Sequence, residues 1–234
     1  MTNLATTFVK FSPLHASAEK LGARWLDVAG WRCPNDYGDP AAEMAALRAD
    51  VGLGDLSPLG KIQIEGQAAA ALLADTLGGA PATVGGHARL PAGDLYCLRP
   101  DLYFLSLPPT ADLATAARLA SAAAARPDLV TVTDVTHGLA AIALAGPRAL
   151  EVLTRVCGLD FSPAAFPSPG ARQSSVAKTR QLIVRRDQNP GLPCFTLYGA
   201  RSLAAYVWGV LLDAGRPFAL RPVGLAALSA LETA

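Results

Sequence analysis

One pattern of strand, glycine, helix and glycine occurs twice in this chain of 234 residues. The first copy reads KIQIEG then QAAAALLADTLGG, and the second reads AAIALAG then PRALEVLTRVCG, about 80 residues later. Such a repeat favours a pseudo-duplicated α+β fold, in which each half carries an antiparallel sheet with helices packed against it. We expect a single domain over residues 1–234, with pseudo-repeated halves of about 1–126 and 127–234.

Hydrophobic periodicity and turn residues predict the local elements. A proline-, serine- and glycine-rich loop is expected over residues 162–175 and a turn over residues 188–191. A hairpin is expected from strands 94–98 and 102–107. The other predicted strands are 61–65, 178–186 and 193–199, with two short strands between 130 and 145; the predicted helices are 40–51, 67–76, 112–125, 147–157 and 201–214.

The composition bounds the kind of partner that the protein can have. Hydrophobic residues make up 51% and charged residues only 17%, which indicates extensive buried or interfacial surface and makes a protein partner plausible. The formal net charge is +1 and the chain has no dense Lys/Arg run, so we expect neither nucleic acid nor an anionic membrane as a partner. The start of the sequence does not resemble a signal peptide, which favours a cytoplasmic protein.

The residues that commonly bind metals or act as nucleophiles are scattered. His15, His87 and His137 lie far apart without metal-ligand spacing, so no metal site is expected. The four cysteines stand singly, which is typical of reduced core cysteines, with a catalytic thiol as the alternative. The sequence contains no phosphate-binding glycine loop and no serine-hydrolase elbow.

Longer phrases carry a family resemblance. AGWRCPNDYG, followed by AEMAALRADVGLGDLSPLGKIQIEG, resembles the N-terminal signature of the aminomethyltransferase family, the glycine-cleavage T-proteins. The second half, from LAGPRALEVLTRVCGLDF to CFTLYGARSLAAYVWGVLLDAG, resembles the gamma subunit of heterotetrameric sarcosine oxidase. The resemblance implies the folate-binding fold of that superfamily, with tetrahydrofolate as its cofactor. GLAALSALETA stands where T-proteins continue into a C-terminal barrel, so we expect that barrel to be lacking.

The resemblance also implies roles for individual residues. Asp94 matches the acidic motif that assists C–N cleavage, and is the implied catalytic residue. The implied cofactor-binding residues are Tyr37, Asp55, Ser57, Lys61, Thr196 and Tyr198. Turn chemistry offers a structural interpretation of several of them: Asp55 and Ser57 would cap a turn, Lys61 would begin a strand at the surface, and Asp94 would be a turn residue.

Several family residues are replaced. Gly93 stands where the acidic pair has its second member, and LSLPP replaces a segment whose asparagine contacts folate. Thr196 replaces a glutamate that can pair with the pterin edge, and Leu228 and Ser229 replace an arginine and an aspartate.

These losses favour a non-catalytic or weakly folate-binding accessory subunit. Its partners would be proteins of a larger, flavin-containing complex, or further copies in a homo-oligomer. The alternative is an active tetrahydrofolate-dependent methyl- or aminomethyltransferase with a remodelled pocket, in which Asp94 assists proton transfer and Tyr37 and Tyr198 line the pterin site. A folate sensor or iron–sulfur assembly helper ranks last, because that branch's KGCYxGQE-type motif is missing.

Overall fold

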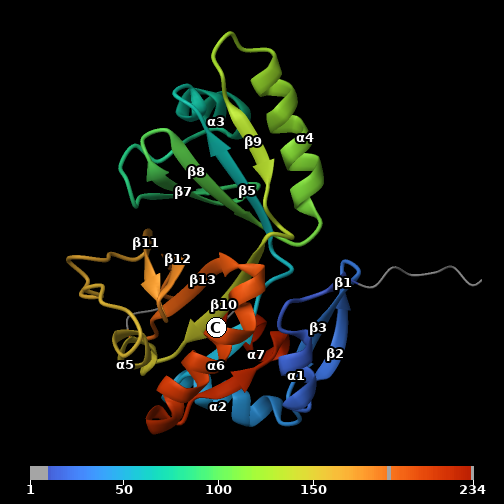
Figure 1. Cartoon of the computed structure of the whole chain (residues 1–234), viewed down its shortest axis with the longest axis vertical. Coiled ribbons are helices and arrows are strands. Elements are labelled where there is room, and N and C mark those ends of the chain that lie inside the picture. Colours follow the sequence, from blue (N-terminus) through green and yellow to red (C-terminus); the bar gives the residue numbers. More distant parts are fainter. Residues whose placement is uncertain (1–9, 189–190, 233–234) are drawn as a thin grey trace, which may run out of the picture.

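The computed structural model of the protein describes residues 10–188 and 191–232. Two large sheets lie one above the other, each with helices on its outer side (Figure 1). The upper sheet has the order β6-β7-β8-β5-β9, and its neighbouring strands are antiparallel. Its strands are β5 (Gly60–Glu65), β6 (His87–Leu90), β7 (Gly93–Arg99), β8 (Leu102–Leu107) and β9 (Thr131–Asp134), and its helices are α3 (Ala69–Leu77) and α4 (Ala111–Ala124).

The lower sheet repeats this order as β11-β12-β13-β10-β4 and adds β14 in parallel at its edge. Its strands are β4 (Gly52–Asp55), β10 (Leu139–Ala145), β11 (Gly170–Val176), β12 (Thr179–Arg185), β13 (Cys194–Ala200) and β14 (Arg221–Val223). The helices around it are α2 (Pro40–Ala49), α5 (Ala149–Thr154), α6 (Ala204–Gly215) and α7 (Leu225–Glu232). Since β4 comes early in the chain and β9 late, each sheet takes one strand from the other predicted half.

A third, small sheet lies beside the lower one (Figure 1). It has the order β1-β3-β2 and consists of β1 (Lys10–Phe11), β2 (Arg24–Val28) and β3 (Trp31–Asp36). Helix α1 (His15–Lys20) connects β1 to β2 along the chain. The sequence analysis did not predict these elements, because residues 10–36 show neither a clear period nor strong turn signals.

Strand alternation divides each large sheet into a helix-facing side and a side that faces the other sheet. Ile62 and Ile64 of β5 pack with Leu72, Leu73 and the rest of the α3 and α4 core. In the lower sheet, Ile142 and Leu144 of β10 face the core of α5 and α6. A third cluster joins the inner sides of the two sheets: Tyr96, Phe104, Ala141, Ala171, Leu182, Val184 and Tyr198. The molecule is therefore layered as helices, sheet, sheet and helices.

The repeated glycines explain why the two halves are built alike. Gly66 follows β5 with φ +148°, and a Cβ there would lie 2.4 Å from the carbonyl oxygen of Leu129. Gly146 follows β10 with φ +128°, and its Cβ would lie 2.5 Å from the carbonyl oxygen of Asp50. In both copies the chain that enters the neighbouring strand, β9 or β4, passes directly against the glycine, so a side chain is excluded.

A repeated turn, which the sequence analysis did not identify, precedes each of these strands. The Asp55 carboxylate accepts the backbone N–H of Ser57 at 2.9 Å, and the Asp134 carboxylate accepts that of Thr136 at 2.8 Å. The Ser57 hydroxyl accepts the N–H of Ala141, and the Thr136 hydroxyl accepts that of Lys61. The turn before β5 is therefore bonded to β10, and the turn before β10 is bonded to β5.

The fold class predicted from the sequence is confirmed, and most element predictions match the structure within a few residues. Three details differ. Residues 170–175 form most of strand β11 and are not loop, and the helix predicted from Pro147 begins at Ala149, after a turn in which the Ala149 N–H donates to Gly146. The predicted last helix begins with a 3₁₀ turn, Arg201–Leu203. Residues 189 and 190 of the predicted turn at 188–191 lie outside the described residues.

Candidate functional site

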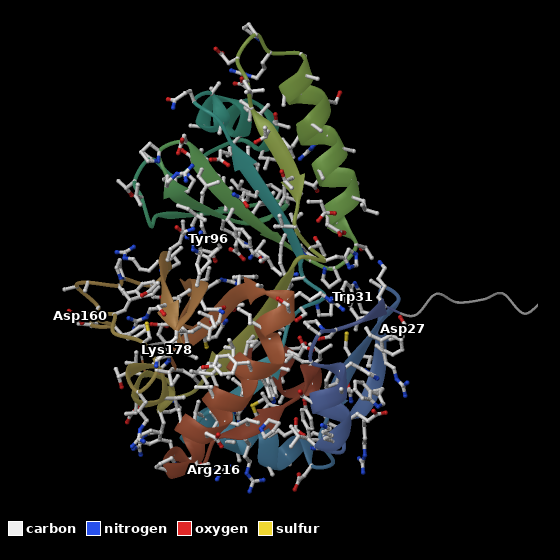
Figure 2. The ribbon with its side chains drawn as sticks, in the orientation of Figure 1. Asp27, Trp31, Tyr96, Asp160, Lys178 and Arg216 are labelled. Atoms are coloured by element: carbon white, nitrogen blue, oxygen red, sulfur yellow. The ribbon has the colours of Figure 1, made fainter. Side chains whose placement is uncertain are left out.

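A cavity of about 540 Å³ lies between the two large sheets and reaches α7 and the edge strand β2. Figure 2 shows Tyr96, one of its lining residues, at the level where the upper and lower sheets meet. Three of the predicted site residues line the cavity, namely Asp94, Thr196 and Tyr198. The volume is in the range of a small-molecule site.

The strand β10 shows how the sequence makes room for this cavity. Its residues alternate between Ala140, Ile142 and Leu144 on the helix-facing side and Ala141, Ala143 and Ala145 on the inner side. Ala143 and Ala145 line the cavity. Because alanine fills little space beyond the backbone, this face of the sheet leaves a hollow that larger side chains would occupy.

Asp94 is surrounded by cationic and hydrogen-bonding groups. Its Oδ1 atom lies 2.7 Å from Nε2 of His87, and its Oδ2 atom accepts from the Arg89 guanidinium at 2.5 Å. Nη1 of Arg186 lies 3.5 Å from Oδ2. His87 and Arg89 come from β6, which pairs with β7 so that Arg89 stands opposite Asp94, whereas Arg186 follows β12 of the other sheet.

These contacts decide the protonation state of Asp94. Burial by itself raises the pKa of this carboxyl, but the hydrogen bonds from His87 and Arg89 and the positive charges of Arg186 and Arg89 outweigh it and lower the pKa below its ordinary value. At neutral pH Asp94 is therefore an anion with both oxygens bonded. A carboxylate in this state is a weak proton acceptor.

Gly93 stands where the family resemblance implies the second acid, and its backbone leaves no room for a side chain. Its φ is +158°, and a Cβ at this position would lie 2.1 Å from the carbonyl oxygen of Ser106 on the paired strand β8. The close pairing of β7 and β8 therefore excludes the side chain. The acidic pair could be restored only if the hairpin moved.

Tyr198 and Thr196 lie on the inner side of β13. The Tyr198 hydroxyl hydrogen-bonds the Ser106 hydroxyl of the upper sheet at 2.9 Å, and burial raises the pKa of Tyr198 to about 12. The ring also packs against Phe104, with 4.8 Å between the centroids. Tyr198 is thus a link between the sheets as well as part of the cavity wall.

The other four predicted site residues are not among those that line the cavity. Asp55, Ser57 and Lys61 are buried in the repeated turn, while Leu56 and Leu59 of the same segment line the cavity. Burial of Asp55 raises the pKa of its carboxyl, although hydrogen bonds from Ser12 and Ser57 oppose this shift. Asp55 caps the turn by accepting the Ser57 N–H, and both side chains also bond outside it, Asp55 to the Ser12 hydroxyl and Ser57 to the Ala141 N–H.

Lys61 does not lie at the surface, as its structural interpretation assumed. It is fully buried, and its Nζ atom donates to the carbonyl oxygens of Ser57, Leu59 and Thr136 at 2.7–3.1 Å. Burial lowers the pKa of Lys61 to about 8, opposed by the charges of Asp55 and two further aspartates. The side chain joins the two repeated turns, a role that its place in the sequence does not reveal.

Tyr37 lies near the same cluster, and its hydroxyl is buried without a hydrogen-bond partner. Burial raises the pKa of Tyr37, and the negative charges of Asp55 and Glu43 raise it further. The Tyr37 backbone N–H donates to Glu43, whose other oxygen accepts from Gly224 before α7. Glu43 therefore fastens the end of β3 to the beginning of α7, beside the cavity.

The remaining reactive side chains show little that points to metal or thiol chemistry. Within residues 10–188 and 191–232, no three His, Cys, Asp or Glu side chains gather as a metal site. Cys33, Cys97 and Cys157 are buried and Cys194, which lines the cavity, is partly exposed; none of these four cysteines forms a disulfide. Burial raises the pKa of the Cys33 thiol to about 12, which opposes a nucleophilic role. No helix in this described part has the length and apolarity that crossing a bilayer would require.

The cavity only partly fits the folate that the family resemblance implies. Its volume and its apolar walls suit a ring system of that size. A pterin presents a guanidine-like edge that needs a carboxylate, and Thr196 cannot supply one. Asp94, the only carboxylate among the described lining residues, is already bonded to His87 and Arg89.

The sequence analysis missed the two arginines of the cavity. Arg89 could have been found, since HARL, Pro91-Ala92 and GDLY form two alternating segments around a two-residue turn, which places Arg89 opposite Asp94. Arg186 follows β12 of the lower sheet and meets Asp94 only when the two sheets stack. No local sequence signal predicts that contact.

Comparison with known proteins agrees with this architecture. The sequence matches the family described as the GCVT N-terminal domain over residues 14–88 and 93–233. It is 33% identical to the aminomethyltransferase of Saccharopolyspora erythraea over 94% of this chain, and 32% identical to that of Cutibacterium acnes over 97%. The chain spans 62% and 65% of the length of these two relatives.

Two solved structures share the fold. The glycine cleavage system aminomethyltransferase T of Bartonella henselae superposes with a TM-score of 0.80 at 26% identity, covering 96% of this chain and 62% of that one. A chain of the heterotetrameric sarcosine oxidase from Corynebacterium sp. U-96 superposes with a TM-score of 0.68 at 22% identity, covering 91% of this chain and 97% of that one. Both structures support the fold.

Proposed function

This chain belongs to the GCVT N-terminal domain family, and from that premise we propose that it is an accessory subunit of a larger complex. The complex would serve folate-linked one-carbon and methylamine metabolism, and the chain itself would be non-catalytic or only weakly folate-binding. The observation that carries this proposal is the state of Asp94. Its two oxygens are bonded to His87 and Arg89, with Arg186 nearby, so it is not poised to accept a proton.

Two further observations support the loss of catalysis. The backbone at Gly93 excludes the second acid of the family pair, since a Cβ there would meet the Ser106 carbonyl. Among the described lining residues, no carboxylate is available for the pterin edge, because Thr196 stands where the resemblance implies a glutamate and Asp94 is already bonded. Electrostatic catalysis requires charged groups that are held in position and available to the substrate, and these positions do not provide them.

The surface favours partner proteins, and the compartment proposed for the complex is the cytoplasm. Large apolar side chains are exposed at several places, including Leu26 beside the cavity and Tyr206 on α6, which are 46% and 51% exposed. The sarcosine oxidase that shares the fold is a heterotetramer. For this chain the proposed partners are proteins of a larger, flavin-containing complex, with a homo-oligomer as the other arrangement.

The first experiment measures catalysis directly. We expect the purified chain to transfer no aminomethyl group from a lipoyl carrier protein to tetrahydrofolate above the uncatalysed rate, with the Bartonella henselae enzyme as positive control. Asp94→Asn should leave that background unchanged. A rate above background that Asp94→Asn abolishes would contradict the accessory role.

One observation favours the alternative of an active transferase with a remodelled pocket. The lowered pKa of Asp94 keeps a negative charge at the cavity wall at neutral pH, and an anion there could stabilise a cationic one-carbon unit. The same assay decides between the two functions. Anaerobic calorimetry with tetrahydrofolate adds the affinity, which the accessory role expects to be weaker than about 1 μM, or about −8 kcal/mol.

A further inference from the structure

Helix α6 presents an uncharged side to solvent. The segment from Ser202 to Leu212 contains no charged residue. One side of the helix packs into the core of the lower sheet through Val207, Trp208 and Leu211. The opposite side is open to solvent, and its Tyr206 is 51% exposed. Because charged and polar side chains normally cover the solvent side of a helix, this side is suited to contact another protein surface.

The residues on this side have the spacing of a seam between two helices. Ser202, Tyr206, Gly209 and Asp213 follow one another at intervals of four, three and four residues, the spacing at which coiled-coil helices meet a partner. Ser202, Tyr206 and Asp213 are exposed and Gly209 is partly exposed. The stripe of these four residues runs along α6 towards Arg216, which Figure 2 shows at the bottom of the molecule.

The stripe is complementary to itself when two copies of α6 run antiparallel. Tyr206 and Gly209 lie equally far along the chain from the middle of the stripe, and so do Ser202 and Asp213. A two-fold axis at this midpoint places Tyr206 of each copy against Gly209 of the other. The same axis places Ser202 of each copy against Asp213 of the other. Both kinds of contact therefore form in a single register.

Each of these contacts is chemically matched. A Cβ at Gly209 would meet no neighbouring atom within 4 Å, so the space above this glycine can accept the ring of a tyrosine. The Ser202 hydroxyl can donate a hydrogen bond to the Asp213 carboxylate. Asp213 forms an ion pair with Arg216 of its own copy, but its side chain is 68% exposed and its carboxylate can accept more than one donor.

We propose that α6 is a self-association surface, through which two copies of this chain form an antiparallel helix pair with Tyr206 of each copy packed over Gly209 of the other. A pair of single helices buries less area than a standard protein interface, so the dimer is weak, with a dissociation constant in the micromolar range. None of the described residues that line the cavity belongs to α6, so the helix pair leaves the cavity free. The proposal goes beyond the function proposed above and does not depend on folate binding.

Sedimentation equilibrium of the full chain, from about 5 μM to about 1 mM, measures the dimer. Tyr206→Ala should weaken it by roughly 10-fold or more, because an aromatic anchor is lost. Gly209→Leu should weaken it as strongly although it adds apolar surface, because the new side chain fills the space that Tyr206 needs. Leu129→Ala, which removes an 83% exposed leucine beside β9, is the matched control and should leave the dissociation constant unchanged. A wild type that stays monomeric, or Gly209→Leu that associates like the wild type, would overturn the proposal.

Position 202 tests the antiparallel register. Ser202→Lys brings an ammonium group to Asp213 of the other copy and should tighten the dimer by roughly 3-fold at low salt. Ser202→Asp brings two carboxylates together and should weaken it by roughly 3-fold. In a parallel pair, residue 202 of each copy would meet residue 202 of the other, so both variants would weaken the dimer. Effects of the same sign would therefore overturn the proposed helix pair.

The outcomes for the helix pair and for the proposed function are separate. Circular dichroism checks that each variant is folded, which is expected because Ser202, Tyr206 and Gly209 lie on the solvent side of the helix. A chain that stays monomeric up to about 1 mM would overturn the helix pair, assign this side of α6 to a different protein and leave the accessory role standing. Aminomethyl transfer that depends on Asp94 would overturn the accessory role and leave the helix pair standing.

Discussion

At the scale of single residues, Lys61 shows how a charged side chain can be structural in this fold. Its ammonium group donates to three carbonyl oxygens in the two repeated turns, so it satisfies backbone acceptors that would otherwise lie buried without partners. Burial nevertheless disfavours the charged form, which is why its pKa falls to about 8. The same residue therefore stabilises the turns and makes stability depend on pH.

The pH dependence of Lys61 has a definite sign. Between pH 8 and the ordinary lysine value of 10.5, the unfolded chain binds a proton at Lys61 that the folded chain does not. The free energy of unfolding of the wild type should therefore rise across this window relative to Lys61→Met, by about 1 to 3 kcal/mol. Urea unfolding of both proteins at pH 7.5 to 10 measures this difference, in which other titrating groups cancel.

Lys20→Met is the control for this measurement. Lys20 is exposed in α1, so its removal should produce no such trend. A constant difference between the wild type and Lys61→Met across the window would show that Lys61 titrates in the folded protein as it does in the unfolded chain.

The environment of Asp94 illustrates the limits of reading residues singly. Its place at a strand entry was predictable, and so was the hairpin that brings Arg89 opposite it. Arg186 comes from the other sheet, 92 residues later in the chain, and it was not predictable from local patterns. Whether Asp94 serves as a base or as a bonded anion depends both on Arg89 of its own sheet and on Arg186 of the other sheet.

At the scale of elements, the glycine after each central strand is the feature that the sequence displays most clearly. The backbone of the neighbouring chain passes within 2.5 Å of the place where a Cβ would stand at Gly66 and at Gly146. Neither glycine serves merely to end a strand. Each permits the close approach by which β9 and β4 join their sheets.

Substitution of these glycines tests that interpretation. Gly66→Ala and Gly146→Ala should each lower the free energy of unfolding by more than about 2 kcal/mol, because a backbone oxygen blocks the new methyl group and φ is positive. Gly158→Ala, with no atom within 4 Å of the added Cβ, should change it by less than about 1 kcal/mol. Chemical denaturation compares all three, and equal effects would argue against the close approach.

At the scale of the whole molecule, the two large sheets share a core. Tyr96 and Phe104 of the upper sheet pack with Leu182, Val184 and Tyr198 of the lower sheet. The strand exchange adds to this coupling, since β4 and β9 each leave their own half. We therefore expect the two layers to unfold as one cooperative unit.

The tryptophans allow a direct test of this coupling. Trp25 and Trp31 lie in the small sheet and Trp208 lies in α6, so all three are outside the upper sheet and its helices α3 and α4. Leu119→Ala in α4, a fully buried side chain of the upper core, should lower the free energy of unfolding by about 2 to 5 kcal/mol as read by tryptophan fluorescence. Leu113→Ala, 71% exposed on the same helix, should change it by no more than about 0.5 kcal/mol. An unshifted fluorescence transition in Leu119→Ala would mean that the layers unfold independently.

The sequence by itself determined the duplicated α+β architecture, because strand alternation, helical spacing and the repeated glycines can be recognised within short stretches of chain. The close approach that excludes side chains at Gly66 and Gly146 was decided by tertiary structure, since the approaching segments lie far away in the chain. The small N-terminal sheet, the burial of Lys61 and the cavity were decided only by tertiary structure. They depend on which faces meet when one sheet stacks on another, and a single local pattern is compatible with several such arrangements. The contact of Arg186 with Asp94 is of this kind, since neither residue's neighbours specify the other's position.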